Sequence, residues 1–168
     1  MPPKRLVEYW ENEPNWVKRF VQSSFELNAT LCGITVVQDS IWTKSAIQQF
    51  LKHMGKIRET TKKQTILYRG SWVVSPTMHP ACFDMENCQF MSCSKSISIA
   101  REFAGKKGFI HVFRCDKGVG IYDLEDIYGD EPVKREKEVL IYPGCHLTFS
   151  KKVGNKLYWD VTADKPTL

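Results

Sequence analysis

The sequence contains no hydrophobic run approaching the ~20 residues that a membrane-spanning helix needs. Its first five residues, Met-Pro-Pro-Lys-Arg, also lack the apolar core of a secretory signal. We therefore expect no membrane partner. We also expect a cytoplasmic location, unless a separate export route delivers the protein into a host cell.

No repeat, low-complexity tract or linker divides the 168 residues. A chain of this length, with 42% hydrophobic and 26% charged residues, can bury about two thirds of its unfolded surface without a disulfide or a metal. We expect residues 1–168 to form a single domain that acts as a monomer.

The six cysteines include no Cys-x-x-Cys pair and show no compact disulfide framework. Ligand spacing is the main sequence signal for zinc, so the group of His79, Cys82, Cys88 and Cys93 does not predict a site. We expect no metal. We also expect buried thiols, which is the usual state of cysteine in a reducing compartment.

The net charge is +5 and the isoelectric point is about 8.9, which favours an acidic partner. Basic dipeptides are scattered along the chain, at residues 4–5, 62–63, 106–107 and 151–152. Such scatter is typical of a solvated surface rather than a nucleic-acid stripe. A nucleic-acid partner is therefore disfavoured, although it stays open as an alternative.

The first 63 residues are predicted to be mainly helical, because apolar residues recur at helical spacing over residues 14–25 and 39–54. Pro14 suits the first position of the first helix. Asp39, Ser40 or Thr43 can cap the second. Both helices are expected to face the core.

From residue 64 onward, short β-prone runs replace the helical pattern. Strands are expected at residues 65–69, 89–94, 109–114, 120–124, 138–142, 146–151 and 157–161. Gly154 and Asn155 predict the turn of a hairpin between the last two. The fold class is therefore α+β, with a helical N-terminal layer on a strand-rich half.

Three of these runs carry conspicuous polar residues, in the order Arg69, Ser92 and Glu138, with Glu136 just before the last. Side chains at i and i+2 of a strand share a face, so the carboxylates of Glu136 and Glu138 are expected to point the same way. Because adjacent carboxylates repel each other and are costly to desolvate, the pair indicates a chemical role.

The motifs Tyr68-Arg69-Gly70, Ser92-Cys93-Ser94 and Glu136-Lys137-Glu138 resemble those of the mono-ADP-ribosyltransferases of the arginine-serine-glutamate class. This class includes binary-toxin and exoenzyme transferases and arginine-specific animal ectoenzymes. Residues 98–104 match the helix that follows the serines in the family, and the motifs span residues 67–144. The resemblance implies an ADP-ribosyltransferase-like two-sheet β core, NAD+ as the substrate, and transfer of one ADP-ribose to an acceptor.

The resemblance also implies roles for residues on the NAD+ side. Glu138 would stabilise the positive charge that develops on the ribose as nicotinamide leaves, and Ser92 would hold that carboxylate in place. Arg69 would bind the diphosphate through its fork of donors. Gly70 would let the nicotinamide amide approach the backbone.

Phe103 and Lys106 match the family's nicotinamide-covering aromatic and phosphate-binding cation. Glu136 matches the acceptor-side position, where Glu goes with a protein arginine as the acceptor. Because an arginine side chain stays protonated, it needs such a carboxylate to orient it. Tyr128 lies in the preceding segment, which corresponds to the family's acceptor-recognition loop.

Three functions stay open. The first is transfer of ADP-ribose to arginine on a protein. The second is NAD+ hydrolysis, or transfer to a non-arginine or nucleic-acid acceptor. The third, an inactive NAD+ or ADP-ribose binding module, is disfavoured because Arg69, Ser92 and Glu138 are all present.

Overall fold

The computed structural model describes residues 27–29, 31, 42–71, 84–124 and 137–163. The chain divides into two compact units, Met1–Arg58 and Glu59–Leu168. The helix predicted over residues 14–25 lies outside the described residues. Among the described residues, no helix combines the length and apolar character needed to cross a membrane.

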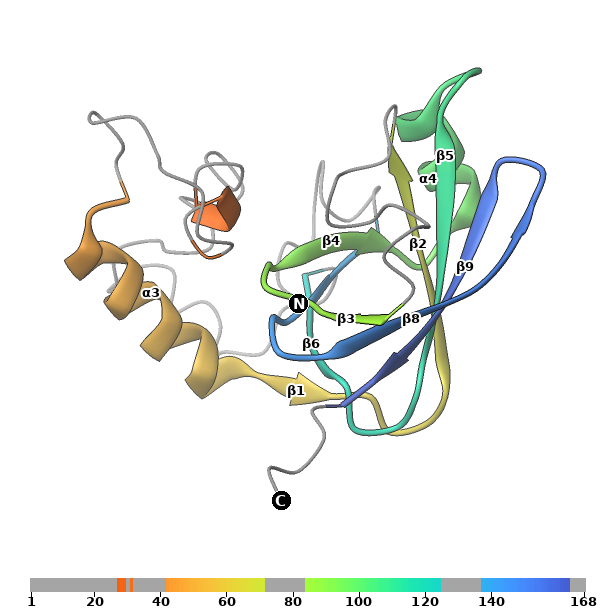
Figure 1. The fold of residues 1–168 in the computed structure, drawn as a ribbon. Helices are drawn as coiled ribbons and strands as arrows, with labels where there is room; N and C mark the ends of the chain where they lie inside the picture. The colour runs from red at the N-terminus through yellow and green to blue at the C-terminus, as the bar shows by residue number, and fades with distance from the viewer. Residues whose placement is uncertain (1–26, 30, 32–41, 72–83, 125–136, 164–168) are drawn as a thin grey trace, which may run out of the picture. The chain divides into compact units, whose positions relative to one another are not determined.

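In the first unit, helix α3 spans Lys44–Ile57 (Figure 1). Thr43 is its N-cap, and its side-chain oxygen accepts a hydrogen bond from the Ala46 backbone N–H at 3.1 Å. This bond satisfies one of the N–H groups that a helix start leaves unpaired. Phe50 lies on the buried face and packs edge-on against Trp42. The second predicted helix and one of its three candidate caps are thereby confirmed.

The second unit is built from short strands and one helix. In its described residues these are β1 (Glu59–Thr60), β2 (Thr65–Ser71), β3 (Asp84–Glu86), β4 (Met91–Ser94), α4 (Ile97–Ala104), β5 (Phe109–Cys115), β6 (Gly120–Asp123), β7 (Glu138–Ile141), β8 (His146–Val153) and β9 (Lys156–Thr162). The sequence did not predict β1 and β3, which are too short to show a periodicity. The predicted hairpin is present, because β8 and β9 pair up to Val153 and Lys156 around Gly154 and Asn155.

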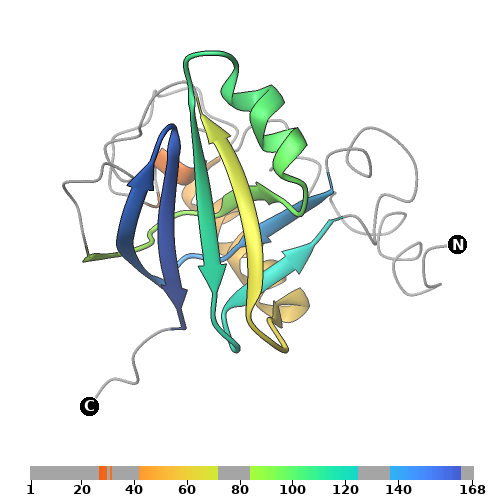
Figure 2. The same cartoon turned by 90° about the vertical axis from the view of Figure 1, so that its right-hand side faces the viewer.

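The described strands form one hydrogen-bonded sheet in the order β1-β6-β7-β4-β2-β5-β9-β8-β3, and among them only β5 and β9 pair in parallel. The ladder is weakest between β2 and β4, which pair only through Tyr68 and Ser94. Figure 2 shows the strands on the two sides of this junction crossing each other. Strands on both sides of this junction contribute side chains to one hydrophobic core, for example Val139 from β7 and Trp159 from β9. The predicted α+β fold with a two-sheet β core is confirmed.

Helix α4 packs on the other face of β2 and β5, with Ala100 and Ala104 in a small apolar cluster. Two glycines allow this close approach. A Cβ atom on Gly70 would lie 1.9 Å from the carbonyl oxygen of Ala100, and one on Gly108 would lie 2.0 Å from that of Ala104. Only glycine fits at these two positions, because any Cβ atom would clash with the backbone of α4.

Cys93, Cys115 and Cys145 are buried free thiols, as expected. Cys88, in contrast, is disulfide-bonded, which corrects the expectation that it is a thiol. Pairing depends on the separation of two Cα atoms in the folded chain, and sequence spacing does not give that separation.

Candidate functional site

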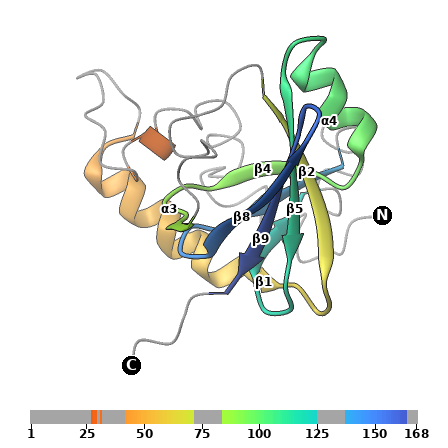
Figure 3. The same ribbon diagram turned by 45° about the vertical axis from the view of Figure 1, so that its right-hand side comes forward.

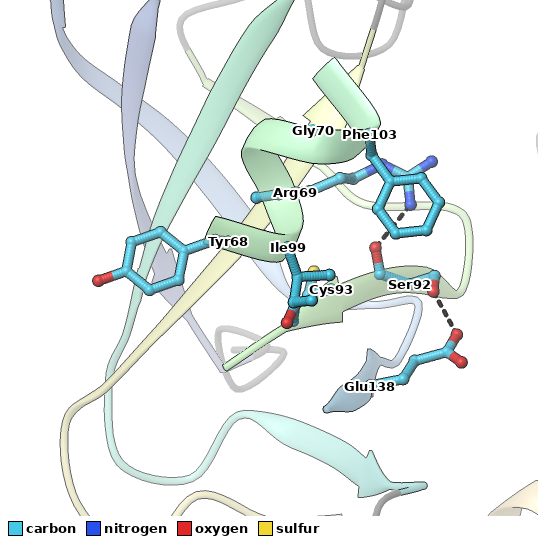
Figure 4. Close-up of a pocket in the computed structure, with 10 residues that line it drawn as sticks. Tyr68, Arg69, Gly70, Ser92, Cys93, Ile99, Phe103 and Glu138 are labelled. Carbon is cyan, nitrogen blue, oxygen red and sulfur yellow. Dashed lines mark hydrogen bonds between the residues drawn. The ribbon is translucent and has the colours of Figure 1, made fainter. Parts of the chain in front are cut away.

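A cavity of about 240 Å³ lies where β2, β4 and α4 meet the start of β7 (Figure 4). All three predicted motifs contribute polar side chains to its wall, and Arg69, Ser92 and Glu138 are among them. The remaining lining residues are Tyr68, Gly70, Cys93, Ser94, Ile99, Ala100 and Phe103. The fold therefore brings together Arg69 and Glu138, which lie 69 positions apart in the sequence.

Arg69, Ser92 and Glu138 are joined by hydrogen bonds. The Ser92 hydroxyl donates to Glu138 Oε1, and Arg69 Nη1 donates to the backbone carbonyl of Ser92 at 2.7 Å. Ser92 reaches Glu138 because the register pairs Ser94 with Glu138, which makes Ser92 a diagonal neighbour on the adjacent strand. Glu138 is only 7% exposed, and a carboxylate that buried requires such a donor.

The backbone turns sharply immediately before Glu138. Lys137 has a φ angle of 49°, in the left-handed region that residues with a Cβ rarely adopt. The strand begins only at Glu138, so the same-face argument does not apply to Glu136 and Glu138, and the direction of Glu136 stays a prediction. Strand periodicity does not pass through a left-handed residue, and Glu136 itself lies outside the described residues.

Two backbone hydrogen bonds hold the start of β7 in place. The Lys95 backbone N–H donates to the carbonyl of Lys137 at 3.1 Å, and the Leu124 N–H donates to that of Glu138 at 3.0 Å. The Lys95 ammonium also forms an ion pair with Asp123 at 2.5 Å. Lys95 was not identified from the sequence, although its position directly after the motif residue Ser94 places it next to the predicted site.

Helix α4 forms another wall of the cavity through Ile99, Ala100 and Phe103. Phe103 is 53% exposed, so it is not a core residue, and its ring lies beside Arg69 in Figure 4. Lys106 is exposed in the turn after α4 and is not among the residues that line the cavity. Tyr128 lies outside the described residues.

The cysteine between the two serines is not a nucleophile in this structure. Cys93 Sγ donates to the carbonyl of Met91 at 3.7 Å. Burial raises the pKa of the Cys93 thiol to about 12, and the nearby Glu138 acts in the same direction. Because only the thiolate is strongly nucleophilic, the structure disfavours cysteine chemistry in the cavity.

A buried histidine lies next to Arg69 on the neighbouring strand, since β2 and β5 pair Arg69 with His111. Trp159 Nε1 donates to His111 Nδ1 at 3.1 Å, and Ser71 Oγ lies 3.4 Å from His111 Nε2. Burial, and then the charge of Arg69, lowers the pKa of His111 to about 4. The imidazole is therefore neutral near pH 7. Sequence reasoning missed this residue, because a single histidine in an apolar strand carries no distinctive signal.

The cavity combines a guanidinium with a carboxylate that is held by a hydroxyl. The guanidinium suits an anionic group such as a phosphate. The aimed carboxylate suits a group that becomes positive during a reaction. Among the described residues, no group of three His, Cys, Asp or Glu side chains is placed to hold a metal ion.

No protein-family model matches the chain. No curated protein matches it either. Solved structures do match. The ADP-ribosylating toxin BECa of a Clostridium perfringens binary enterotoxin, solved with NADH, is 19% identical with a TM-score of 0.62, and the match covers 94% of this chain and 44% of BECa.

The C3 exoenzyme of Clostridium limosum is 16% identical with a TM-score of 0.60, over 96% of this chain and 90% of the exoenzyme. The eukaryotic mono-ADP-ribosyltransferase ART2.2, solved with NAD, is 19% identical with a TM-score of 0.52, over 74% of this chain and 53% of ART2.2. The chain thus spans about half the length of BECa and of ART2.2. At these identities the similarity establishes the fold.

Proposed function

We propose that this chain, whose fold is that of the mono-ADP-ribosyltransferases, cleaves NAD+ and transfers ADP-ribose to a protein acceptor, releasing nicotinamide. One observation carries this proposal. Arg69, Ser92 and Glu138 converge on one cavity, and the hydroxyl of Ser92 donates to the carboxylate of Glu138.

Glu138 is assigned to the ribose of NAD+. The bond between ribose C1′ and the nicotinamide nitrogen breaks, and its electron pair leaves with nicotinamide. Positive charge then develops on the ribose, as in glycoside cleavage. The Glu138 carboxylate stabilises this charge by accepting a hydrogen bond from the 2′-hydroxyl. Its fixed position is an advantage, because a preorganised group needs little rearrangement during the reaction.

Arg69 and the residues around it are assigned to the rest of the donor. The guanidinium binds the diphosphate, while Gly70 and Phe103 contact the nicotinamide. A cavity of about 240 Å³ lies below the range of ~300–1,000 Å³ for complete ligand sites. It therefore suits the nicotinamide–ribose end of NAD+ rather than the whole dinucleotide. The NADH and NAD in the BECa and ART2.2 structures support NAD+ as the substrate.

Arginine is the proposed acceptor, with Glu136 and Tyr128 on the acceptor side. A guanidinium nitrogen forms the new bond to C1′, and it loses one proton to solvent during the transfer. The Glu136 carboxylate orients the protonated guanidinium and offsets the repulsion between it and the ribose cation. Water in place of arginine gives free ADP-ribose, which is the alternative reaction of the same site.

Cytoplasmic action, in the producing cell or in a host cell, is proposed from the sequence alone. The disulfide at Cys88 weighs against it, because disulfides persist mainly in oxidising compartments. Lys106 remains a proposed phosphate-binding residue, although it lies outside the cavity wall.

Incubation of the protein with isotopically labelled NAD+ and a cell lysate tests the proposal. Mass spectrometry is expected to locate ADP-ribose on arginine side chains of specific proteins. Modification of other residue types would overturn the arginine assignment. Unchanged NAD+, with neither free ADP-ribose nor a modified protein, would overturn the proposed function.

A further inference from the structure

Two segments far apart in the sequence meet at one end of the second unit. The α4–β5 turn and the tip of the β8–β9 hairpin are joined by two hydrogen bonds. Ile110 N–H donates to the carbonyl of Asn155 at 2.9 Å, and the Asn155 side chain donates to the carbonyl of Gly108 at 3.3 Å. Figure 2 and Figure 3 show both segments at the same end of the strands.

All the charged side chains of these two segments are lysines. Residues 105–109 and 150–158 contain five lysines and no acidic residue, and we call these five the lysine cluster: Lys106, Lys107, Lys151, Lys152 and Lys156. The nearest acid beyond the hairpin, Asp160, is paired with Arg114 at 2.5 Å. The net charge of the whole chain is +5, so the five lysines equal its positive excess and the other residues sum to no net charge.

One exposed apolar residue, Val153, lies beside the turn of the hairpin. Val153 is 54% exposed and lies between Lys152 and the turn residue Gly154. The register places Lys151 opposite Tyr158 and Lys152 opposite Leu157. Because neighbouring residues of a strand point to opposite faces, the two lysines flank the hairpin on both sides. An exposed apolar residue thus directly follows two lysines in the strand and pairs with a third, Lys156, across the hairpin.

The aromatic rings at this end are covered by lysines. The Lys151 ammonium lies 5.1 Å from the ring centre of Tyr158, and that of Lys152 lies 5.5 Å from the ring centre of Phe109. Both rings are half-buried. This disfavours single-stranded nucleic acid, whose bases need open aromatic faces for stacking. A protein partner is disfavoured as well, because no exposed Trp, Tyr or Arg of the kind that anchors interfaces lies in these segments.

We propose that the lysine cluster and Val153 dock this protein on an anionic phospholipid surface, with the hairpin tip at the lipid headgroups. Clusters of four to eight basic residues are typical of such docking. A single apolar residue inserted between headgroups adds affinity and selects a membrane over a soluble polyanion. Surface docking requires no spanning segment, so the lack of a long hydrophobic run, from which no membrane partner was expected, does not exclude it.

Sedimentation with phospholipid vesicles tests the proposal, using the full chain. Vesicles of phosphatidylcholine with about 30% phosphatidylserine are expected to bind the protein, and pure phosphatidylcholine is not, because the attraction is electrostatic. Binding should weaken strongly in 1 M salt, at which the Debye length falls to about 3 Å. Equal binding to both kinds of vesicle, or to neither, would overturn the proposal.

Variants of the hairpin sharpen the test. Each lysine near an anionic surface contributes about fivefold in binding, so the combined change Lys151→Gln, Lys152→Gln and Lys156→Gln should lower vesicle binding by about a hundredfold. The matched control, Lys62→Gln with Lys63→Gln, alters two exposed lysines at the opposite end of β2. This control variant should keep most of its vesicle binding. Comparable losses in both variants would show that overall charge, not this surface, governs binding.

A last variant separates a membrane from a soluble polyanion. Val153→Ser should lower binding to phosphatidylserine vesicles by about threefold to tenfold, because less apolar area enters the headgroup layer. It should leave binding to heparin unchanged. Vesicle binding that is insensitive to Val153→Ser would assign the surface to soluble polyanions and contradict the proposal. None of these variants alters the NAD+ cavity, so NAD+ cleavage is expected to continue in each.

Discussion

At the scale of single residues, Arg69 links the proposed NAD+ site to Ser92. Its Nη1 atom donates to the Ser92 carbonyl, and its remaining donors are proposed to bind the NAD+ diphosphate. Arg69→Ala should weaken NAD+ binding by about tenfold to a hundredfold, in line with hydrogen bonds to charged groups. Arg69→Lys should recover only part of this, because an ammonium lacks the bidentate fork.

Calorimetry in a Glu138→Gln background measures this binding without turnover. An Arg69→Ala dissociation constant equal to that of its parent would remove Arg69 from the donor site.

Glu136 and Glu138 are proposed to divide the reaction between the acceptor and the donor. Glu136→Gln should therefore keep NAD+ hydrolysis near wild type, because water needs little help once the ribose cation forms. Transfer to agmatine should fall by about tenfold or more, because a protonated guanidinium approaching that cation needs a nearby anion. Parallel assays of nicotinamide release and of agmatine modification measure the two rates separately. A joint fall of both rates would mean that the two carboxylates act as one unit.

His111 makes stability depend on pH. Its pKa in the folded protein is lowered to about 4 from 6.5, so the unfolded chain binds more protons between these values. Stability should therefore rise as the pH increases from about 4 to 6.5, and it should fall again on acidification. A shift of this size corresponds to about 3 kcal/mol. The lowered pKa of His53 acts in the same direction.

Urea unfolding at a series of pH values measures this dependence, with His111→Gln as the matched variant. Glutamine can accept from Trp159 and donate to Ser71, but it does not titrate. The slope of stability against pH should flatten in this variant. A slope identical to that of wild type would show that His111 does not cause the pH dependence of stability.

At the scale of elements, the packing of α4 on β2 affects both the stability of the fold and the shape of the cavity. Gly70→Ala would place a Cβ atom 1.9 Å from the Ala100 carbonyl oxygen, so the helix must move. Overpacking of this kind costs about 1–3 kcal/mol. Because α4 supplies Ala100 and Phe103 to the cavity, NAD+ cleavage should fall as well.

Gly55→Ala is the control for that variant, because nothing lies within 4 Å of a Cβ atom at this position in α3. It should raise stability slightly, since alanine is the better helix former. Thermal unfolding and nicotinamide release of both variants give the comparison. A Gly70→Ala protein as stable and as active as wild type would contradict the packing described for α4.

The sequence predicted the elements well where a periodicity ran long enough. The helix over residues 44–57 and the hairpin at Gly154 followed from spacing and turn residues. The failures are local and have physical causes. β1 and β3 are two and three residues long, which is too short for a pattern. Lys137 adopts a left-handed conformation, which no side-chain alternation reveals.

At the scale of the whole molecule, the order of the motifs predicted which residues would meet, but not how. Arg69, Ser92 and Glu138 were identified from the sequence, and the ladder places all three on one cavity. The bond from Arg69 to the Ser92 carbonyl and the bracing of β7 by Lys95 were not predictable. They depend on long-range register, in which strands distant in the chain become neighbours.

The distribution of charge over the molecule was likewise not predictable from the local sequence. In the sequence the lysine dipeptides appeared scattered, which indicated an ordinary solvated surface. In the fold, the dipeptides at residues 106–107 and 151–152 join Lys156 at one end of the strands. Their convergence depends on the parallel pairing of β5 with β9, a long-range contact for which the local sequence carries no signal.

The most direct test of the proposed function is the rate of nicotinamide release from NAD+ by Glu138→Gln compared with wild type. Glutamine keeps the shape of the side chain and can still accept the hydrogen bond from Ser92, but it cannot offset the charge of the ribose cation. Loss of one aimed electrostatic contact commonly lowers the rate by about a hundredfold or more. We expect a loss of that size with the melting temperature close to that of wild type. A rate within about threefold of wild type would show that Glu138 does not stabilise the transition state, and it would contradict the account at its centre.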